Sequence, residues 1–187
     1  MDALEALQKR VSSPRLVAPA PAGEKLQAIF RAALRAADHG NLRPWRFLVV
    51  DGDARNALGE LYEQAALSDT PDLDDTQRQR FRAMPMRAPM VVVAIANCQD
   101  HPKVPESEQL IATGAAVQNM ITAAFAQGVG AYWRTGALAY HPRVAEGLGL
   151  ETNEHIVGFV YLGTPEGTAK PVPELQVEEF FSPWPAK

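Results

Sequence analysis

The stretch Pro89-Met90-Val91-Val92-Val93-Ala94-Ile95-Ala96 is a continuous run of apolar residues, rich in β-branched side chains. A short run of this kind, bounded by Pro and Asn, is typical of a β-strand that is covered on both faces. A strand without a polar face belongs in the middle of a sheet. This stretch therefore predicts a central strand with other elements packed on either side of it.

Helical and strand patterns continue on both sides of this strand. The first expected helix ends near residue 10. The other expected helices cover about 24–37, 54–66, 74–84, 105–127 and 142–148. The other expected strands are 45–51, which we expect to be buried, the segment that ends at 133, and 156–162. The polar loop 68–72 is expected to be mobile. Because helices and strands are interleaved without strict alternation, the order predicts an α+β sheet with helices around it.

The helix expected at 105–127 is apolar or small on almost every face. At a rise of about 1.5 Å per residue it would be roughly 35 Å long. A helix that is apolar all round has to be buried all round, and a chain of 187 residues has few elements left to cover it. The pattern therefore predicts that a second subunit packs on this helix.

Length and composition limit the classes of function. With 187 residues, the chain is expected to form one domain over 1–187, with 165–187 as an extended tail. The tail contains Phe180, Phe181 and Trp184, so we expect it to dock on a surface, that of the partner subunit. The net charge of -4 predicts no nucleic-acid partner.

Cysteine usage and the N-terminus predict the compartment. Cys98 is the only cysteine, so an intrachain disulfide is excluded and no Cys/His metal cluster is expected. The first residues are acidic and lack the basic flank and apolar run of a signal peptide. We therefore expect a cytoplasmic protein that has neither a metal site nor a membrane partner.

Three distant segments carry groups suited to a phosphorylated ligand: Arg10-Val11-Ser12, residues 36–45, and Trp133-Arg134-Thr135-Gly136. Each lies where an expected helix or strand ends, so its guanidinium, hydroxyl and backbone N–H groups can face a ligand. Two arginines from separate segments, Arg10 and Arg134, could together hold a phosphate dianion.

Ordinary structural roles remain open for the same residues. Arg10 could be a solvated arginine at a helix C-terminus, where its charge complements the helix dipole. His39 could be a capping or solvated histidine. Trp133 is expected in the core because of its size. Lys103, Glu106 and Glu108 could either cover the edge of a bound ligand or form a charged surface.

The order and spacing of these segments resemble the nitroreductase family of FMN flavoproteins, in particular its shortest members. The family has an Arg-x-Ser stretch after the first helix, an Ala-Pro-Ser-x-x-Asn-x-Gln-Pro-Trp stretch before the first strand, and a Gly-x-Gly-x-x-Trp-Arg stretch after a long helix. The resemblance covers about 2–164. This chain departs from the pattern at Val11, Asp38, Arg43 and Ser107, where Arg, Ser, Gln and Trp are usual.

The resemblance implies a nitroreductase-like fold, with a central, mostly antiparallel sheet flanked by helices, in an intertwined homodimer. It implies that FMN contacts Arg10, Val11, Ser12, Trp133, Arg134 and Thr135 of one subunit and Arg35, His39 and Asn41 of the other. It also implies that the nicotinamide nucleotide lies on Ala123, Ala124, Phe125, Ala126, Gln127 and Gly128. A buried helix terminus is the alternative interpretation of that last stretch.

The activity that the resemblance implies is that of an FMN-dependent NAD(P)H oxidoreductase. Hydride would pass from NAD(P)H through flavin N5 to an electron-poor small molecule, such as a nitroaromatic or a quinone, in a ping-pong sequence. The cofactor carries this chemistry, so no catalytic side chain is assigned. FMN is expected rather than FAD, because the chain lacks the glycine pattern that binds a pyrophosphate. A flavin store, carrier or sensor on the same fold is the alternative.

Overall fold

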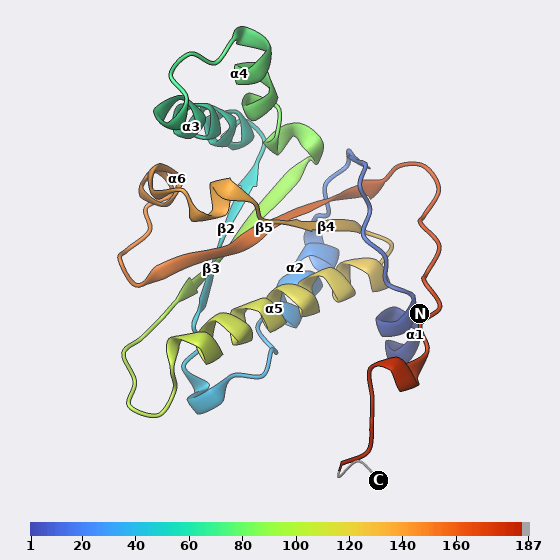
Figure 1. The fold of residues 1–187 in the computed structure, drawn as a ribbon. Coiled ribbons are helices and arrows are strands. Elements are labelled where there is room, and N and C mark those ends of the chain that lie inside the picture. Colours follow the sequence, from blue (N-terminus) through green and yellow to red (C-terminus); the bar gives the residue numbers. More distant parts are fainter. Residues whose placement is uncertain (185–187) are drawn as a thin grey trace.

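The structure is a computed structural model that describes residues 1–184 (Figure 1). Its strands are β1 (Leu16–Val17), β2 (Trp45–Asp51), β3 (Met90–Asn97), β4 (Gly130–Arg134) and β5 (Glu154–Pro165). Its helices are α1 (Ala3–Lys9), α2 (Gly23–Ala33), α3 (Ala54–Asp69), α4 (Asp75–Arg82), α5 (Glu106–Ala126) and α6 (Pro142–Gly147). Short 3-10 turns, η1 to η4, cover His39–Asn41, Pro85–Arg87, Ala137–Tyr140 and Val177–Glu179.

The observed strand order confirms the predicted central strand. β3 lies between β2 and β5, and all its pairings are antiparallel. Residues 91–96 of β3 are completely buried. β5 pairs with β3, with β4 and, at its far end, with β1. The resulting α+β architecture is the one that the interleaved pattern predicts.

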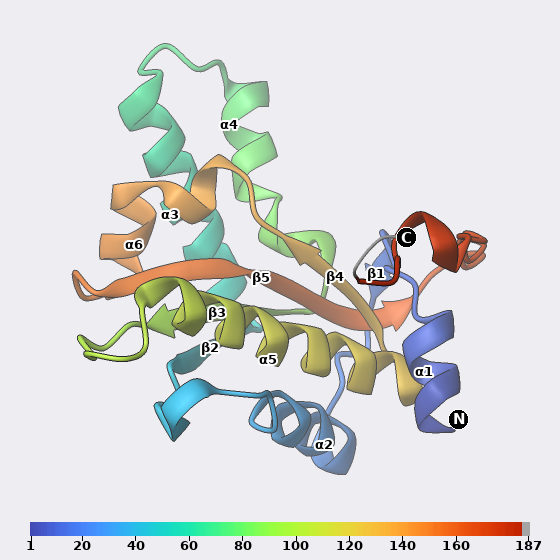
Figure 2. The ribbon, with the colours of Figure 1, turned by 60° about the horizontal axis from the view of Figure 1, so that its bottom comes forward.

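Helices cover both faces of the sheet (Figures 1 and 2). The side chains of β3 alternate between these faces, as in any strand. Val91, Val93 and Ile95 pack under α3 and α6, whereas Val92 and Ala94 pack against α2 and α5. The sheet thus separates two apolar layers, and the functional residues divide between them.

Two ion pairs hold helices α3 and α4 together as a hairpin on the side of the sheet that contains Val91, Val93 and Ile95. The buried carboxylate of Glu63 in α3 accepts hydrogen bonds from Arg78 Nε and Arg82 Nε in α4, at 2.7 and 2.5 Å. Gly59 lets the two backbones approach, because a Cβ there would overlap the Arg82 carbonyl. The hairpin therefore holds the residues after α4 over the end of β4.

The long helix forms over Glu106–Ala126, and its cover by a second subunit stays a prediction. The sheet and α2 bury one side of α5, including Ala116 and Met120, which are completely buried. On the opposite side several residues are exposed, among them Glu108, Ile111 and Gln118. Ile111 on that side is 71% exposed. The exposed positions of the helix thus include polar residues as well as Ile111.

Two sequence predictions need correction. The strand at 45–51 forms as expected, but β2 pairs only with β3 among the described residues, so most of its side chains are half-buried. The helix expected at 24–37 ends at Ala33, because the N–H groups of Arg35 and Ala36 bond three residues back and tighten the chain into a turn. The short strand β1 was not predicted.

The C-terminal tail is exposed throughout its described part. Phe180, Phe181 and Trp184 are 67%, 75% and 94% exposed. The structure of one chain shows no surface that receives these rings within residues 1–184. Pro185 and the two residues after it, which complete the predicted tail, lie outside the described residues. Docking of the tail stays a prediction.

Candidate functional site

A pocket of about 440 Å³ opens where β4 ends beneath the α3–α4 hairpin. It is lined by Tyr62, Phe81, Met84, Arg87, Tyr132, Trp133, Arg134, Thr135, Gly136, Ala137, Leu138, Phe159 and Tyr161. The list contains six aromatic side chains and two arginines. We call this pocket the β4 pocket. It includes three of the residues for which the sequence predicts cofactor binding.

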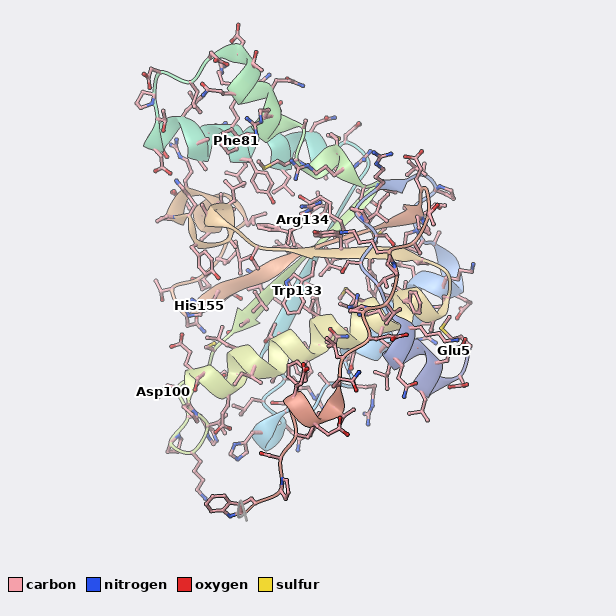
Figure 3. The ribbon with its side chains drawn as sticks, turned by 45° about the vertical axis from the view of Figure 1, so that its right-hand side comes forward. Glu5, Phe81, Asp100, Trp133, Arg134 and His155 are labelled. Atoms are coloured by element: carbon pink, nitrogen blue, oxygen red, sulfur yellow. The ribbon has the colours of Figure 1, made fainter. Side chains whose placement is uncertain are left out.

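Arg134 is the polar centre of the β4 pocket. It is the last residue of β4, and the strand's alternation directs Trp133 and Arg134 to opposite faces of the sheet. Figure 3 shows Arg134 on the side of Phe81 and Trp133 on the side of α5. The Trp133 indole packs in the apolar layer between the sheet and helices α2 and α5, and it donates a hydrogen bond to the Val157 carbonyl at 3.3 Å. Trp133 thus packs against the core but is only half-buried and also lines the pocket.

The Arg134 guanidinium lies among aromatic rings, and no carboxylate of residues 1–184 forms an ion pair with it. Its Cζ is 4.1 Å from the centroid of Tyr132 and 5.5 Å from that of Tyr161, both within cation–π range. Its Nε is buried and has no hydrogen-bond partner among residues 1–184. A buried donor of this kind is costly unless a ligand or water satisfies it.

The surroundings of Arg134 favour an anion. No Asp or Glu of the described chain lines the β4 pocket, whereas Arg87 does. Burial raises the pKa of Tyr161, and the charges of Arg134 and Arg87 act in the opposite direction. The buried Tyr62 hydroxyl is also without a partner within the described residues, and burial raises its pKa. The pocket thus offers unsatisfied donors and positive charge.

The first predicted segment runs beside the same strand. Arg10 caps α1 and donates from Nη1 to Ser12 Oγ at 3.4 Å. Directly after Ser12, the Ser13 N–H donates to the Ala131 carbonyl of β4 at 3.0 Å. Arg10, Val11 and Ser12 are all half-buried. The fold therefore brings the first and third predicted segments to β4, although Arg10 does not line the pocket itself.

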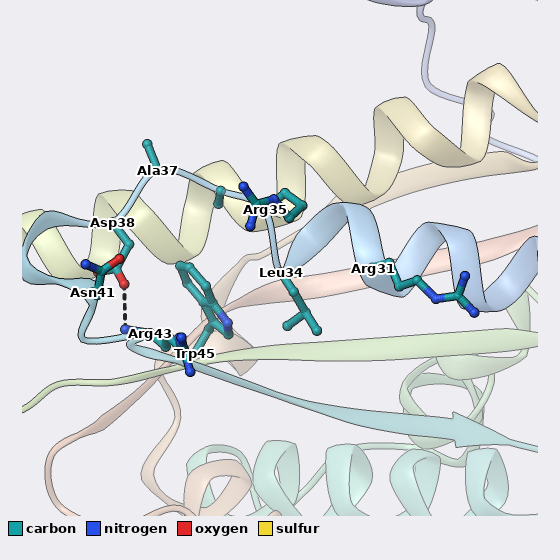
Figure 4. Close-up of a pocket in the computed structure, with 9 residues that line it drawn as sticks. Arg31, Leu34, Arg35, Ala37, Asp38, Asn41, Arg43 and Trp45 are labelled. Carbon is teal, nitrogen blue, oxygen red and sulfur yellow. Dashed lines mark hydrogen bonds between the residues drawn. The ribbon is translucent and has the colours of Figure 1, made fainter.

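The second predicted segment forms a different pocket of about 740 Å³, which we call the α2–β2 pocket (Figure 4). It is lined by Arg31, Leu34, Arg35, Ala36, Ala37, Asp38, Asn41, Arg43 and Trp45. No described residue lines both this pocket and the β4 pocket. One chain thus separates Arg35 and Asn41 from Arg134.

The loop of the α2–β2 pocket has an unusual backbone. Asn41 and Arg43 both have positive φ angles, 53° and 50°, which are uncommon outside glycine. The Asp38 carboxylate supports this conformation by accepting a hydrogen bond from the Arg43 N–H at 2.6 Å. Such backbone outliers cluster at ligand sites. Two of the four departures from the family pattern, Asp38 and Arg43, therefore belong to one turn.

His39 lies at the edge of this loop against α5. Its Nδ1 is 2.6 Å from Glu108 Oε2, and both side chains are exposed. Glu108 was predicted either to cover a ligand edge or to form a charged surface, and the structure pairs it with His39. The His39 imidazole is therefore oriented by a carboxylate from the first turn of α5.

The stretch Ala123–Gly128 ends α5. The Gln127 side chain donates to the Ala123 and Lys25 carbonyls, at 3.1 and 3.3 Å, and Gly128 takes a positive φ of 73°. None of these residues lines either pocket of the described structure. This geometry matches the helix-terminus alternative, and the nicotinamide role of the stretch stays a prediction.

Sequence reasoning missed two groups of residues. Tyr62, Phe81 and Arg87 reach the β4 pocket only because the α3–α4 hairpin folds over the sheet, and no local pattern marks them. The second group bears on the expected absence of a Cys/His metal cluster, which stays a prediction. The fold places single ligand-type side chains together, namely Cys98, Glu106 and His155.

Within residues 1–184, no helix combines the length and the apolar character that a membrane span requires.

Comparisons with known proteins agree with this architecture. Residues 8–164 match the nitroreductase family. A relative from Escherichia coli K12, with the provisional name NAD(P)H nitroreductase YdjA, is 45% identical over 89% of this chain and 90% of its own length. A nitroreductase-like family protein from Bacillus cereus superimposes with a TM-score of 0.83 at 21% identity, over 100% of this chain and 97% of the other.

Another solved structure is the FMN-dependent nitroreductase NfnB from Mycobacterium smegmatis in complex with NADPH. It has a TM-score of 0.75 at 18% identity, over 96% of both chains. The family match spans most of the sequence, and the fold of the neighbours has the same sheet and helices. This chain belongs to the nitroreductase family.

Proposed function

We propose that this protein is an FMN-dependent NAD(P)H oxidoreductase. Bound FMN would accept a hydride from NAD(P)H and pass it to an electron-poor acceptor, such as a nitroaromatic or a quinone, in a ping-pong sequence. The membership in the nitroreductase family and the names of the relatives support this reaction class. The site geometry supports the position of the cofactor.

The observation that carries the proposal is the unsatisfied guanidinium of Arg134. A phosphate would supply the acceptor that its buried Nε lacks. Arg87 adds a second positive charge, and no carboxylate lining the pocket among the described residues competes for it. The donor set therefore fits the phosphate of FMN. Arg10 and Ser12, which lie along the same strand, would complete the anchor.

The protein's own groups would bind and orient, not transfer protons. Tyr132 and Tyr161 hold the Arg134 guanidinium in place by cation–π contact. Backbone N–H groups and arginine charges would stabilise negative charge that develops on the reduced cofactor. No side chain is assigned as a general acid or base.

The separation of the two pockets supports a site shared between subunits. Arg35, His39 and Asn41 belong to the α2–β2 side of the chain, away from Arg134. In a homodimer with two FMN sites at its interface, these residues would reach the flavin of the other subunit. The uncovered face of α5 and the exposed tail supply apolar surface for such a dimer. The nicotinamide nucleotide would approach Ala123–Gly128.

The experiment that tests the proposal is the absorption spectrum of the purified protein, before and after anaerobic addition of NADPH or NADH. An oxidoreductase is expected to show an oxidised FMN spectrum that bleaches with the nucleotide and returns when a nitroaromatic is added. A flavin store or carrier would be yellow but would not bleach within the same time. A colourless protein that fails to take up added FMN would contradict the proposal.

A further inference from the structure

Three side chains with different metal-ligating atoms converge at the end of the molecule opposite α1. Cys98 follows β3, His155 is the second residue of β5, and Glu106 is the first residue of α5. The ligand atoms of all three lie within 4.8 Å of one another, and His155 Nε2 is 3.1 Å from Glu106 Oε1. None of these residues lines the β4 pocket or the α2–β2 pocket.

The fold holds the cysteine in a fixed position. The Cys98 N–H donates to the Asn153 carbonyl at 3.0 Å, and Asn153 Nδ2 donates back to the Cys98 carbonyl at 2.8 Å. The same amide also donates to Asn97 Oδ1 at 2.9 Å. The end of β3 is thereby tied to the start of β5, where His155 lies. The thiol and the imidazole belong to one rigid sheet end.

The backbone that carries Glu106 is fixed from the other side. The Gln109 side chain, buried in α5, donates to the Gln99 and Val104 carbonyls and accepts from the Gln99 N–H, at 2.8, 3.2 and 2.8 Å. These bonds bind the loop 99–104 to the first turns of α5. Glu106 therefore has a defined position relative to Cys98, although the two residues come from different elements.

The three side chains line a cleft of about 390 Å³ that also includes Asp100 and His101. Figure 3 shows Asp100 and His155 at this same end of the molecule. His155 and Glu106 are exposed, whereas Cys98 is buried at the base. An ion could thus enter from solvent and meet the thiol last.

We propose that Cys98, Glu106 and His155 form a binding site for a divalent transition metal of the zinc class. Zn²⁺ takes sulfur at about 2.3 Å and nitrogen or oxygen at about 2.0–2.2 Å, so neighbouring ligands of a tetrahedral ion lie roughly 3.3–3.7 Å apart. His155 Nε2 and Glu106 Oε1 are already 3.1 Å apart, and since no pair of ligand atoms exceeds 4.8 Å, the cluster needs to close by no more than about 1.5 Å. Three protein ligands leave a fourth position for water, as in sites that are not purely structural.

The ligand set selects the class of metal. A thiolate and an imidazole favour Zn²⁺, Co²⁺ or Cu over Mg²⁺ and Ca²⁺, which prefer oxygen ligands. On binding, the thiol loses its proton to solvent, and sulfur, nitrogen and oxygen each donate a lone pair to the ion. No oxidant or reductant takes part.

The test uses the full-length protein, treated with a chelator and then titrated with Co²⁺. Because Cys98 is the only cysteine, any thiolate-to-cobalt charge-transfer band must come from it. We expect that band together with the d–d bands of a tetrahedral site, saturating at one Co²⁺ per chain and displaced by Zn²⁺. Saturation without a thiolate band, or an absence of bands at stoichiometric metal, would overturn the proposal.

Variants give the second measurement. Cys98→Ser should abolish the charge-transfer band. His155→Asn, at an exposed position, should weaken Zn²⁺ binding in competition with a chromophoric chelator. Since the loss of an outer partner alone costs about 10–100-fold in metal affinity, we expect at least about a tenfold loss for a ligand.

The matched control is His141→Asn. His141 also lies near a carboxylate, 3.4 Å from Asp69 Oδ1, but no cysteine is near it among the described residues. Asn is a favourable N-cap residue, so it can replace His141 at the N-terminus of α6. Zn²⁺ affinity should stay at the wild-type value in this variant. The proposal would be wrong if Zn²⁺ affinity fell equally in both histidine variants, or if it were unchanged in His155→Asn and Cys98→Ser. The cluster would then be an ordinary ion pair beside a buried thiol.

Discussion

Arg134 combines a permanent charge, a buried donor without a partner and two tyrosine rings in one position. The rings support the guanidinium from the side, so its hydrogen-bonding edge is available to a ligand. A planar, forked donor binds a phosphate with two parallel bonds, which the point charge of lysine cannot reproduce. The residue is therefore the most sensitive single position of the proposed site.

We expect Arg134→Ala to weaken FMN binding by about 1.5–3 kcal/mol, the usual value of a hydrogen bond to a charged group. Arg10→Ala should act in the same direction. Flavin fluorescence titration of the cofactor-free protein measures both. Arg143→Ala, which removes an exposed arginine on α6, is the control. Wild-type FMN affinity in both Arg134→Ala and Arg10→Ala would remove the phosphate role.

The ion pair between Arg46 and Glu154 ties β2 to the start of β5. Arg46 Nε and Nη2 donate to the two carboxylate oxygens at 2.5 and 2.6 Å, and the Glu154 side chain is only 3% exposed. The hydrogen bond from Arg46 lowers the pKa of Glu154 below its ordinary value of 4.5, against the effect of burial. The unfolded state therefore binds a proton at this group more readily than the folded state does.

The sign of the pH dependence follows from that pKa. The stabilisation from Glu154 is fully present above about pH 4.5 and is lost as the pH falls through the lower folded-state pKa. We expect Glu154→Gln to reduce the free energy of unfolding by about 3 kcal/mol at pH 7 and by less in acid. Urea unfolding at several pH values measures this.

Glu24→Gln is the matched control for that experiment. Glu24 pairs with Arg31 at 3.6 Å, but its side chain is 91% exposed, so the change should stay within about 0.5 kcal/mol. A constant difference between Glu154→Gln and wild type from pH 7 to pH 3 would show that the carboxylate does not titrate as argued.

At the scale of the element, α5 has one face buried against its own sheet and another side that is exposed in the single chain. Ala116 faces its own sheet and is completely buried, whereas Ile111 is largely exposed. A charged substitution at Ala116 therefore tests the packing of the subunit core, whereas a charged substitution at Ile111 tests the proposed subunit interface. The sequence alone could not separate these two positions.

We expect Ile111→Glu to give a folded monomer that loses FMN, and Ala116→Glu to unfold or aggregate because it buries an unpaired charge. Light scattering after size-exclusion chromatography gives the mass, circular dichroism the folding, and absorbance the flavin content. Gln64→Glu, at an exposed position of α3, serves as the control. A stable, yellow dimer of Ile111→Glu would exclude this face as the interface.

At the scale of the whole molecule, dimerisation and cofactor binding should be linked. If each FMN is held by Arg134 of one subunit and His39 of the other, the cofactor stabilises the dimer, and dilution to monomer releases it. The tail would add Phe180 and Phe181 to the partner's surface. These rings are otherwise exposed to water within the described chain.

The double variant Phe180→Ser, Phe181→Ser should therefore raise the dimer dissociation constant by at least about tenfold, because two rings lose their burial. Sedimentation velocity with detection at the flavin wavelength measures mass and cofactor together. The variant should release FMN at higher protein concentration than the wild type. If both proteins dissociate together, or if a monomer keeps its flavin, the shared site or the docked tail is wrong.

The sequence by itself determined those features that local patterns encode. The apolar run at β3, the helical period of α5 and the turn residues near 38–41 depend on neighbouring residues, so the elements and their order could be predicted. The segments around Arg10, Asn41 and Arg134 were found in the same way, because each combines donors with the end of an element. Their resemblance to one family then predicted the fold class and the cofactor.

Only the tertiary structure decided which distant residues meet. Arg87 and Tyr62 line the β4 pocket because a hairpin folds over the sheet. Cys98 meets His155 because antiparallel pairing brings the end of β3 to the start of β5. Which face of α5 stays exposed depends on where α2 packs. Such contacts arise from long-range packing, which leaves no periodic signal in the sequence, so no local pattern could reveal them.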